Sequence, residues 1–171
     1  MTKDKGLIHA LFFLISILFF PGTALPLMYS NQVESLRDLN GIYVLAEGIE
    51  REVEKNGLSN HILAREVGKR LKARGVKVLS REKWLDTSGS PYLYLNANIL
   101  KLKESGEYIY SINISFKQNV YTARAPVEII GAATWTTGGI VGITSRLENI
   151  HRLVLEKAEE FIDAYLLVNP G

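Results

Sequence analysis

The 171-residue sequence predicts an α+β domain, a two-layer sandwich in which two helices cover a sheet of about five mostly antiparallel strands. Residues 60–74 and the stretch after Ser145 carry apolar side chains at helical spacing, whereas residues 91–103 and 107–123 alternate apolar and polar side chains with the period of a strand. Amphipathic helices must each cover a sheet face. The elements follow in the order strand, helix, strand, three further strands, helix.

The N-terminal 24 residues have the pattern of a signal peptide. Lys3 and Lys5 precede the apolar run Leu7–Phe20, and small residues occupy positions −3 and −1 if cleavage follows Ala24. The alternative is an uncleaved membrane anchor. Because the run has 14 residues whereas a membrane span takes about 20, the pattern favours cleavage, with no stable membrane insertion afterwards.

Removal of residues 1–24 leaves 147 residues and lowers the formal net charge from +2 to +1, because two lysines and Asp4 are lost. We expect a linker over residues 25–38 and one domain over residues 39–171. A charge this close to zero argues against nucleic acid as a partner. The basic stretch Arg65–Arg81 coincides with a helix, so we interpret it as a solvated helix face, with a polyanion or membrane-surface contact as the alternative.

The first half of the domain contains a predicted βαβ unit. Residues 39–46 form a strand, and the charged segment 47–55 is an exposed strand end or loop. A helix then spans residues 60–74, with Ser59 as N-cap and Gly75 past its C-terminus. Residues 76–79 form a short strand that can lie parallel to the first. Residues 80–90 form a loop.

Two alternating strands, residues 91–103 and 107–123, predict a β-hairpin. A two-residue turn at Ser105 and Gly106 places Ile99 opposite Ile112, Ala97 opposite Ile114 and Leu95 opposite Phe116, and these three apolar pairs share one face. A slip of one residue would mix apolar and polar side chains on both faces.

Another strand is predicted over residues 129–137, followed by a glycine-rich turn or mobile loop around Gly138–Gly142. The last helix is expected to begin at a capping box of Ser145 and Glu148. Asn169 and Pro170 end it. Its buried face consists of Leu147, Ile150, Val154, Ala158, Phe161, Ile162 and Tyr165.

The polar face of the hairpin is the candidate contact surface. It combines tyrosine with amides, which form adaptable interfaces at low entropic cost. The residues expected to touch a partner are Tyr92, Tyr94, Asn96, Asn113 and Lys117. The alternative explanation is the ordinary solvated side of an antiparallel sheet.

No catalytic, metal or cofactor motif is found in the sequence. The chain has no cysteine, its histidines lack metal-ligand spacing, and neither a GxSxG nor a phosphate-binding glycine loop occurs. We therefore predict no cofactor and a non-enzymatic role. The alternative is a periplasmic enzyme or small-ligand-binding protein with a pocket near the Gly138–Ile143 loop and Trp84.

Short motifs spread over residues 36–170 resemble a family of small exported bacterial proteins of unknown function. They are Leu39-Asn-Gly-Ile-Tyr-Val-Leu, Gly57-Leu-Ser, Arg74-Gly-Val, Glu82-Lys-Trp-Leu, Pro91-Tyr-Leu-Tyr, Gln118-Asn-Val, Thr134-Trp and Phe161…Val168-Asn-Pro. The resemblance implies no activity, cofactor or catalytic residue. The element order is more loosely similar to α/β domains of envelope-assembly proteins, such as the Tol-system translocation protein and curli-secretion lipoproteins.

Together these features predict a secreted or periplasmic domain that binds another envelope protein or assists assembly. Self-association is a second mode of action.

We expect the exported form to begin at Leu25, because cleavage after Ala24 satisfies the small-residue rule. Intact-mass measurement of the protein from the envelope fraction tests this. Retention of the full-length chain in the cytoplasm contradicts it.

Overall fold

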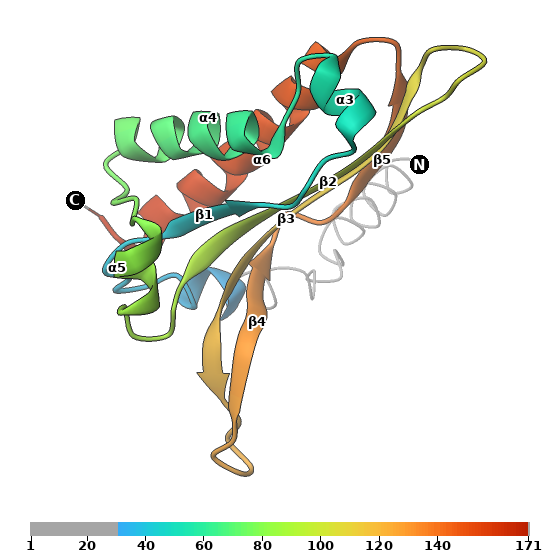
Figure 1. Ribbon diagram of the computed structural model, residues 1–171. Coiled ribbons are helices and arrows are strands. Elements are labelled where there is room, and N and C mark those ends of the chain that lie inside the picture. The colour runs from blue at the N-terminus through green and yellow to red at the C-terminus, as the bar shows by residue number, and fades with distance from the viewer. Residues whose placement is uncertain (1–30, 171) are drawn as a thin grey trace, which may run out of the picture. The chain divides into compact units, whose positions relative to one another are not determined.

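The computed structural model describes residues 31–170, and the predicted signal peptide lies outside them. The predicted α+β fold is confirmed: a mixed, open sheet carries helices on one face (Figure 1). The elements are β1 Tyr43–Ala46, α3 Arg51–Lys55, α4 Asn60–Ala73, α5 Arg81–Leu85, β2 Tyr92–Lys101, β3 Tyr108–Tyr121, β4 Glu128–Thr136, β5 Ile140–Thr144 and α6 Leu147–Val168.

The sheet has the order β1-β2-β3-β4, and β5 also pairs with β3. β1 runs parallel to β2, and the other pairings are antiparallel. The 14-residue β3 is long enough to pair with β5 at its start and with β4 at its end. Every other strand therefore depends, directly or through β2, on β3.

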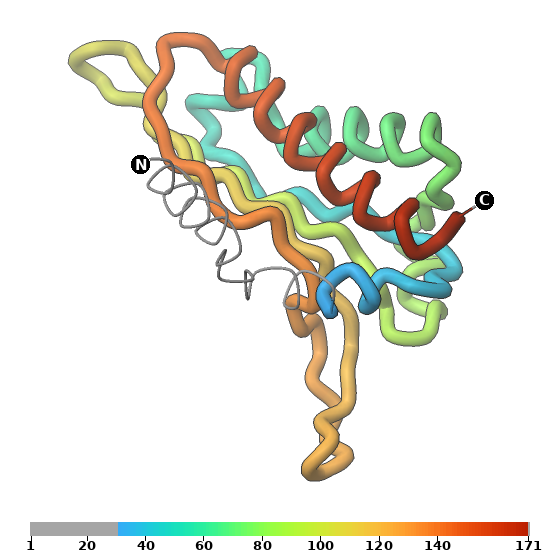
Figure 2. The backbone as a smooth tube through the Cα atoms, turned by 180° about the vertical axis from the view of Figure 1, so that it is seen from behind, coloured from blue at the N-terminus to red at the C-terminus, as the bar shows by residue number. Residues whose placement is uncertain are grey.

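The core lies between the sheet and the two long helices, α4 and α6, which lie side by side (Figures 1 and 2). Phe161 of α6 is fully buried. Its ring stacks on Phe116 of β3 with centroids 5.7 Å apart and meets Trp135 of β4 edge-on at 5.2 Å. The whole predicted buried face of the last helix, from Leu147 to Tyr165, is buried as expected.

Ion pairs join the outer surfaces of the two long helices. Arg70 of α4 and Arg74, the C-cap of that helix, each contact Glu159 of α6, and Arg74 also contacts Asp163. The charged groups are partly exposed, so each pair contributes at most about 1 kcal/mol. Part of the basic stretch thus serves helix–helix contact.

The helix α4 follows its prediction closely. The Ser59 side chain accepts a hydrogen bond from the Ile62 amide at 3.3 Å, and Gly75 has φ +83° just beyond the C-cap. The start of α6 differs from its prediction. Arg146 is the N-cap with no side-chain cap, and Thr144 Oγ1 accepts from the Arg146 amide instead, so the predicted capping box is absent.

The hairpin register differs from the prediction by two residues. Ile99 lies opposite Tyr110 and not Ile112, because four residues, 103–106, form the turn. Since side chains alternate with period two, this shift keeps every residue on its predicted face. The sorting of apolar and polar side chains is confirmed, whereas the individual pairs are wrong.

The structure has five strands among residues 31–170, the number predicted, but one of the predicted strands is missing and a different segment forms the fifth. Residues 76–79 make a single parallel bridge, Val78 with Ile42, because α5 begins directly afterwards at the Ser80 cap. The predicted glycine loop contains β5 instead. A glycine fits at position 142 because the Tyr110 ring lies against it: a Cβ there would come within 2.5 Å of Tyr110 Oη.

Two segments outside the predicted helices and strands add to the core. Within the predicted linker, residues 31–34 form a helical turn, and Val33 and Leu36 are buried, so the domain includes residues from 31 onward. The segment 47–55, expected to be an exposed strand end or loop, contains α3, whose Val53 is fully buried.

Replacement of Phe161 by alanine is expected to lower the free energy of unfolding by about 3–5 kcal/mol, because it removes the ring between Phe116 and Trp135. The control is Leu167→Ala on the same helix, which is 72% exposed and should cost about 0.5 kcal/mol or less. Urea unfolding measures both. Similar losses in the two variants would contradict this description of the core.

Candidate functional site

The candidate site lies on the face of the sheet opposite α4 and α6, called the open face below. Even-numbered residues of β2 and odd-numbered residues of β3 up to Lys117 point to it. Within residues 31–170, neither long helix covers this face (Figure 1). Register places Tyr92 opposite Lys117 and Asn96 opposite Asn113, so the predicted contact residues are neighbours.

A carboxylate that the sequence analysis did not select organises this cluster. Glu47, just after β1, accepts hydrogen bonds at Oε2 from Tyr94 Oη at 2.5 Å and from Asn96 Nδ2 at 2.6 Å. Asn96 Oδ1 in turn accepts from Asn98 Nδ2 at 2.6 Å. Hydrogen bonds to an ionised acceptor are the stronger kind, so Glu47 restrains these side chains.

Lys117 and Asn113 are held by other contacts. Lys117 Nζ lies 3.9 Å from the Tyr94 ring centroid, which is a cation–π contact. Asn113 Nδ2 donates to Thr136 Oγ1 of β4 at 3.3 Å. The five predicted residues therefore occupy one restrained surface that spans β2 and β3 and reaches β4.

An aromatic row continues the cluster to the sheet edge. Trp84 of α5 stacks on Tyr43 with centroids 4.9 Å apart and meets Tyr92 edge-on at 5.5 Å, and Tyr92 meets Tyr94 edge-on at 6.4 Å. No local pattern predicts this row, because its residues come from three separate elements. The predicted loop around Trp84 is the helix α5, which supplies the ring.

Glu47 raises the pKa of Tyr94 to about 12, chiefly because the carboxylate accepts the phenol proton's hydrogen bond, with burial as the next cause. Burial alone raises the pKa of Tyr92. Both phenols are therefore neutral hydrogen-bonding groups at physiological pH. The arrangement suits binding through hydrogen bonds and ring contacts.

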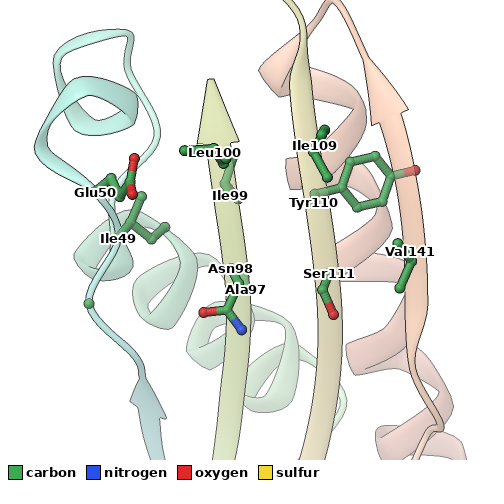
Figure 3. A pocket seen from close by; sticks show the side chains of 11 residues that line it. Ile49, Glu50, Ala97, Asn98, Ile99, Leu100, Ile109, Tyr110, Ser111 and Val141 are labelled. Carbon is green, nitrogen blue, oxygen red and sulfur yellow. The ribbon is translucent and has the colours of Figure 1, made fainter. Parts of the chain in front are cut away.

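A shallow hollow of about 310 Å³ lies near β5, at the opposite end of the open face from the aromatic row. We call it the apolar hollow. Figure 3 shows Ile49, Leu100, Ile109 and Val141 around it, and Glu50 is the one charged residue in its lining. Trp84 belongs to a separate hollow beside Tyr92. The structure does not bring Trp84 and the Gly138–Ile143 segment together.

The end of β3 and the start of β4 project from the sheet as a two-stranded arm, residues 118–132, beyond the last residue paired with β2 (Figures 1 and 2). Bulges between Phe116 and Lys117 and between Gln118 and Val120 mark its base. Gly131, with φ +65°, lies so close to Tyr92 that a Cβ would be 2.9 Å from Tyr92 Oη.

Other histidine and carboxylate side chains do not form a metal site in the described part of the chain. Among residues 31–170, no three His, Asp or Glu side chains are close enough together to hold a metal ion. His151 Nε2 is buried and lacks a hydrogen-bond partner within the same residues. No helix in this part of the chain combines the length and apolarity required to cross a membrane.

Comparison with known proteins adds little to these observations. No family model matches the chain, and no curated protein matches it. Among solved structures, the chain is similar to the PelC dodecamer from Paraburkholderia phytofirmans, with 14% identity over 75% of this chain and 90% of that one and a TM-score of 0.40. The family resemblance noted from the sequence stays a prediction.

Substitution of Glu47 by glutamine is expected to lower the pKa of Tyr94 from about 12 toward its ordinary value of 10, because the carboxylate acceptor is lost. The raised folded-state pKa stabilises the protonated fold fully below the unfolded-state pKa. That contribution disappears as pH rises from about 10 through about 12. Phenolate absorbance, followed against pH, measures the shift.

The control is Glu52→Gln on the exposed surface of α3, which should leave the Tyr94 titration unchanged. An unchanged titration in Glu47→Gln as well would show that the carboxylate does not hold the phenol.

Proposed function

We propose that this chain is a non-enzymatic binding module of the cell envelope, whose open face binds another envelope protein during assembly. The observation that supports it best is the gathering of Tyr92, Tyr94, Asn96, Asn113 and Lys117 on the face opposite the two long helices. The sequence pattern predicted all five as contact residues. Export is part of the proposal and rests on the N-terminal sequence pattern.

The chemistry of the open face suits a protein partner. Tyrosine is enriched at protein interfaces, where its ring buries area and its hydroxyl finds a polar partner. Glu47 and Lys117 restrain the Tyr94 ring before any partner arrives. Restraint before binding lowers the entropy that association would otherwise cost, and so favours affinity.

The partner should present hydrogen-bond acceptors and apolar area together. Lys117 and the amides of Asn98 and Asn113 supply donors, whereas the rings of Tyr92 and Tyr94 supply apolar contact. A carboxylate on the partner would meet Lys117 and be repelled by Glu47, so its position relative to the two groups would determine binding orientation.

The second candidate is a periplasmic enzyme or small-ligand-binding protein, and the apolar hollow beside Val141 is the observation in its favour. Its lining includes two titratable side chains, Glu50 and Tyr110. A lining of this kind suits a small apolar ligand with one hydrogen-bonding or cationic group better than acid–base chemistry, which needs positioned proton donors and acceptors.

Photocrosslinking from the two faces tests the main proposal. A photoreactive residue in place of Asn113, which lies outside the apolar hollow, should capture a defined envelope protein in the native host, whereas one in place of Lys72 on α4 should not. Mass spectrometry then identifies the captured protein. Capture of the same products from both positions would contradict a specific open face.

Affinity for the captured protein gives the decisive measurement. Tyr94→Ala and Lys117→Ala should each weaken binding by more than about tenfold, the size expected for central interface residues. The matched control, Lys72→Ala, should bind like the unmodified protein. Unchanged affinity in both open-face variants would show that the proposed surface is wrong.

A further inference from the structure

Exposed apolar side chains gather at the two opposite ends of β3. On the arm, Ile130 is 81% exposed, and the other exposed apolar residues are Tyr121, Val127 and Ile129. At the apolar hollow, Val141 is 76% exposed and Leu100 is also exposed, and the exposed Ile143 lies next to the hollow, opposite Ile109. Apolar side chains gathered in this way usually mark an interaction surface.

One of the two surfaces projects from the sheet and the other is recessed. The arm is a narrow two-stranded projection (Figure 2), whereas the other end of the sheet is hollowed by about 310 Å³ between α3 and β5 (Figure 3). A two-stranded ribbon by itself is marginally stable in water. Burial of the exposed side chains of the arm against another surface would therefore stabilise the arm.

The charged groups at the tip of the arm and in the hollow have opposite signs. The arm carries two charged side chains: Arg124 lies in its loop, whereas Glu128 lies at the start of β4, where its carboxylate accepts a hydrogen bond from Asn119 Nδ2 at 3.1 Å. The lining of the apolar hollow carries one charged side chain, the carboxylate of Glu50. A hairpin tip seated in the hollow would bring unlike charges together, which favours this orientation over its reverse.

The arm cannot occupy the hollow of its own chain. Ile109 at the hollow and Tyr121 on the arm lie twelve residues apart on one continuous strand, which at roughly 3.3 Å per residue is a path of about 40 Å. The arm extends away from α3 and β5, the elements that border the hollow (Figure 1). Any contact between the two surfaces must therefore join different copies.

We propose that the chain assembles head to tail, the arm of one copy seated in the apolar hollow of the next. Such a contact is heterologous, because each copy contributes a different surface. It repeats along the assembly and closes into a ring or continues as a filament, depending on the rotation between copies. The contact lies outside the Tyr94–Lys117 cluster and goes beyond the function proposed above.

Two matched substitutions test the proposal, each made in the protein in the form in which it is purified from the expressing cells. Val127→Glu alters the arm and Val141→Glu alters the hollow, at positions exposed enough to leave the fold intact. In sedimentation velocity, the average mass of the unmodified protein should increase with protein concentration, whereas each variant alone should stay a monomer. An equimolar mixture of the variants should form a species of two chain masses, because one intact arm meets one intact hollow.

The control is Leu167→Glu on the exposed side of α6, which should assemble like the unmodified protein. Tyr94→Ala should also assemble normally, which separates this proposal from the binding function. An unmodified protein that stays monomeric at its highest soluble concentration overturns the proposal. So does dimerisation of Val141→Glu alone, since that would indicate an arm-to-arm contact.

A lipid surface is the competing occupant of the arm. Flotation with vesicles of phosphatidylglycerol and phosphatidylethanolamine distinguishes it: arm-dependent flotation of a monomeric protein would overturn the proposal.

Disulfide trapping provides a direct second measurement, because the chain has no cysteine of its own. Oxidation of a mixture of Val127→Cys and Val141→Cys should yield the mixed dimer in preference to either self-linked dimer. A statistical distribution of the three dimers would overturn the contact.

Discussion

The alternation of side chains along β2 and β3 is the constraint on which the rest of the structure depends. Leu93, Leu95, Ile112, Ile114 and Phe116 all point to one face, and each is nearly or fully buried. Both amphipathic helices must pack there, since that face is where apolar area can be removed from water. The opposite face is then left without a long helix among residues 31–170. The position of every candidate contact residue follows from this asymmetry.

The length of β3 produces the second notable feature of the molecule. Because one strand outlasts its neighbour β2, its far end pairs with β4 alone and leaves the sheet as an arm. Bulges at the base of the arm add twist and redirect the ribbon, as bulges commonly do. Gly131 allows Tyr92 to approach the ribbon closely. The same strand thus carries the core, the open face and both exposed apolar surfaces.

Polar contacts on the open face turn a solvated sheet into an ordered surface. The carboxylate of Glu47 joins the end of β1 to Tyr94 and Asn96 on β2, while Lys117 approaches the Tyr94 ring from β3. These contacts cross three strands, so the surface keeps its shape only while the sheet is intact. A binding function of this face and a head-to-tail contact through the arm would therefore coexist, because they use different parts of one rigid sheet.

The sequence by itself determined the α+β class, the extent of α4, the buried face of α6 and the side of the sheet on which each hairpin residue lies. Those properties follow from local periodicity and capping, which neighbouring residues express without help from the rest of the chain. Only the tertiary structure decided the hairpin register, the conversion of a glycine-rich segment into β5, the entry of Val33 and Leu36 into the core, and the role of Glu47. The register follows from the length of the turn at residues 103–106, and the other three depend on partners distant in sequence, such as Tyr110 for Gly142 or Tyr94 for Glu47. A contact of that kind leaves no periodic trace in the segment that makes it.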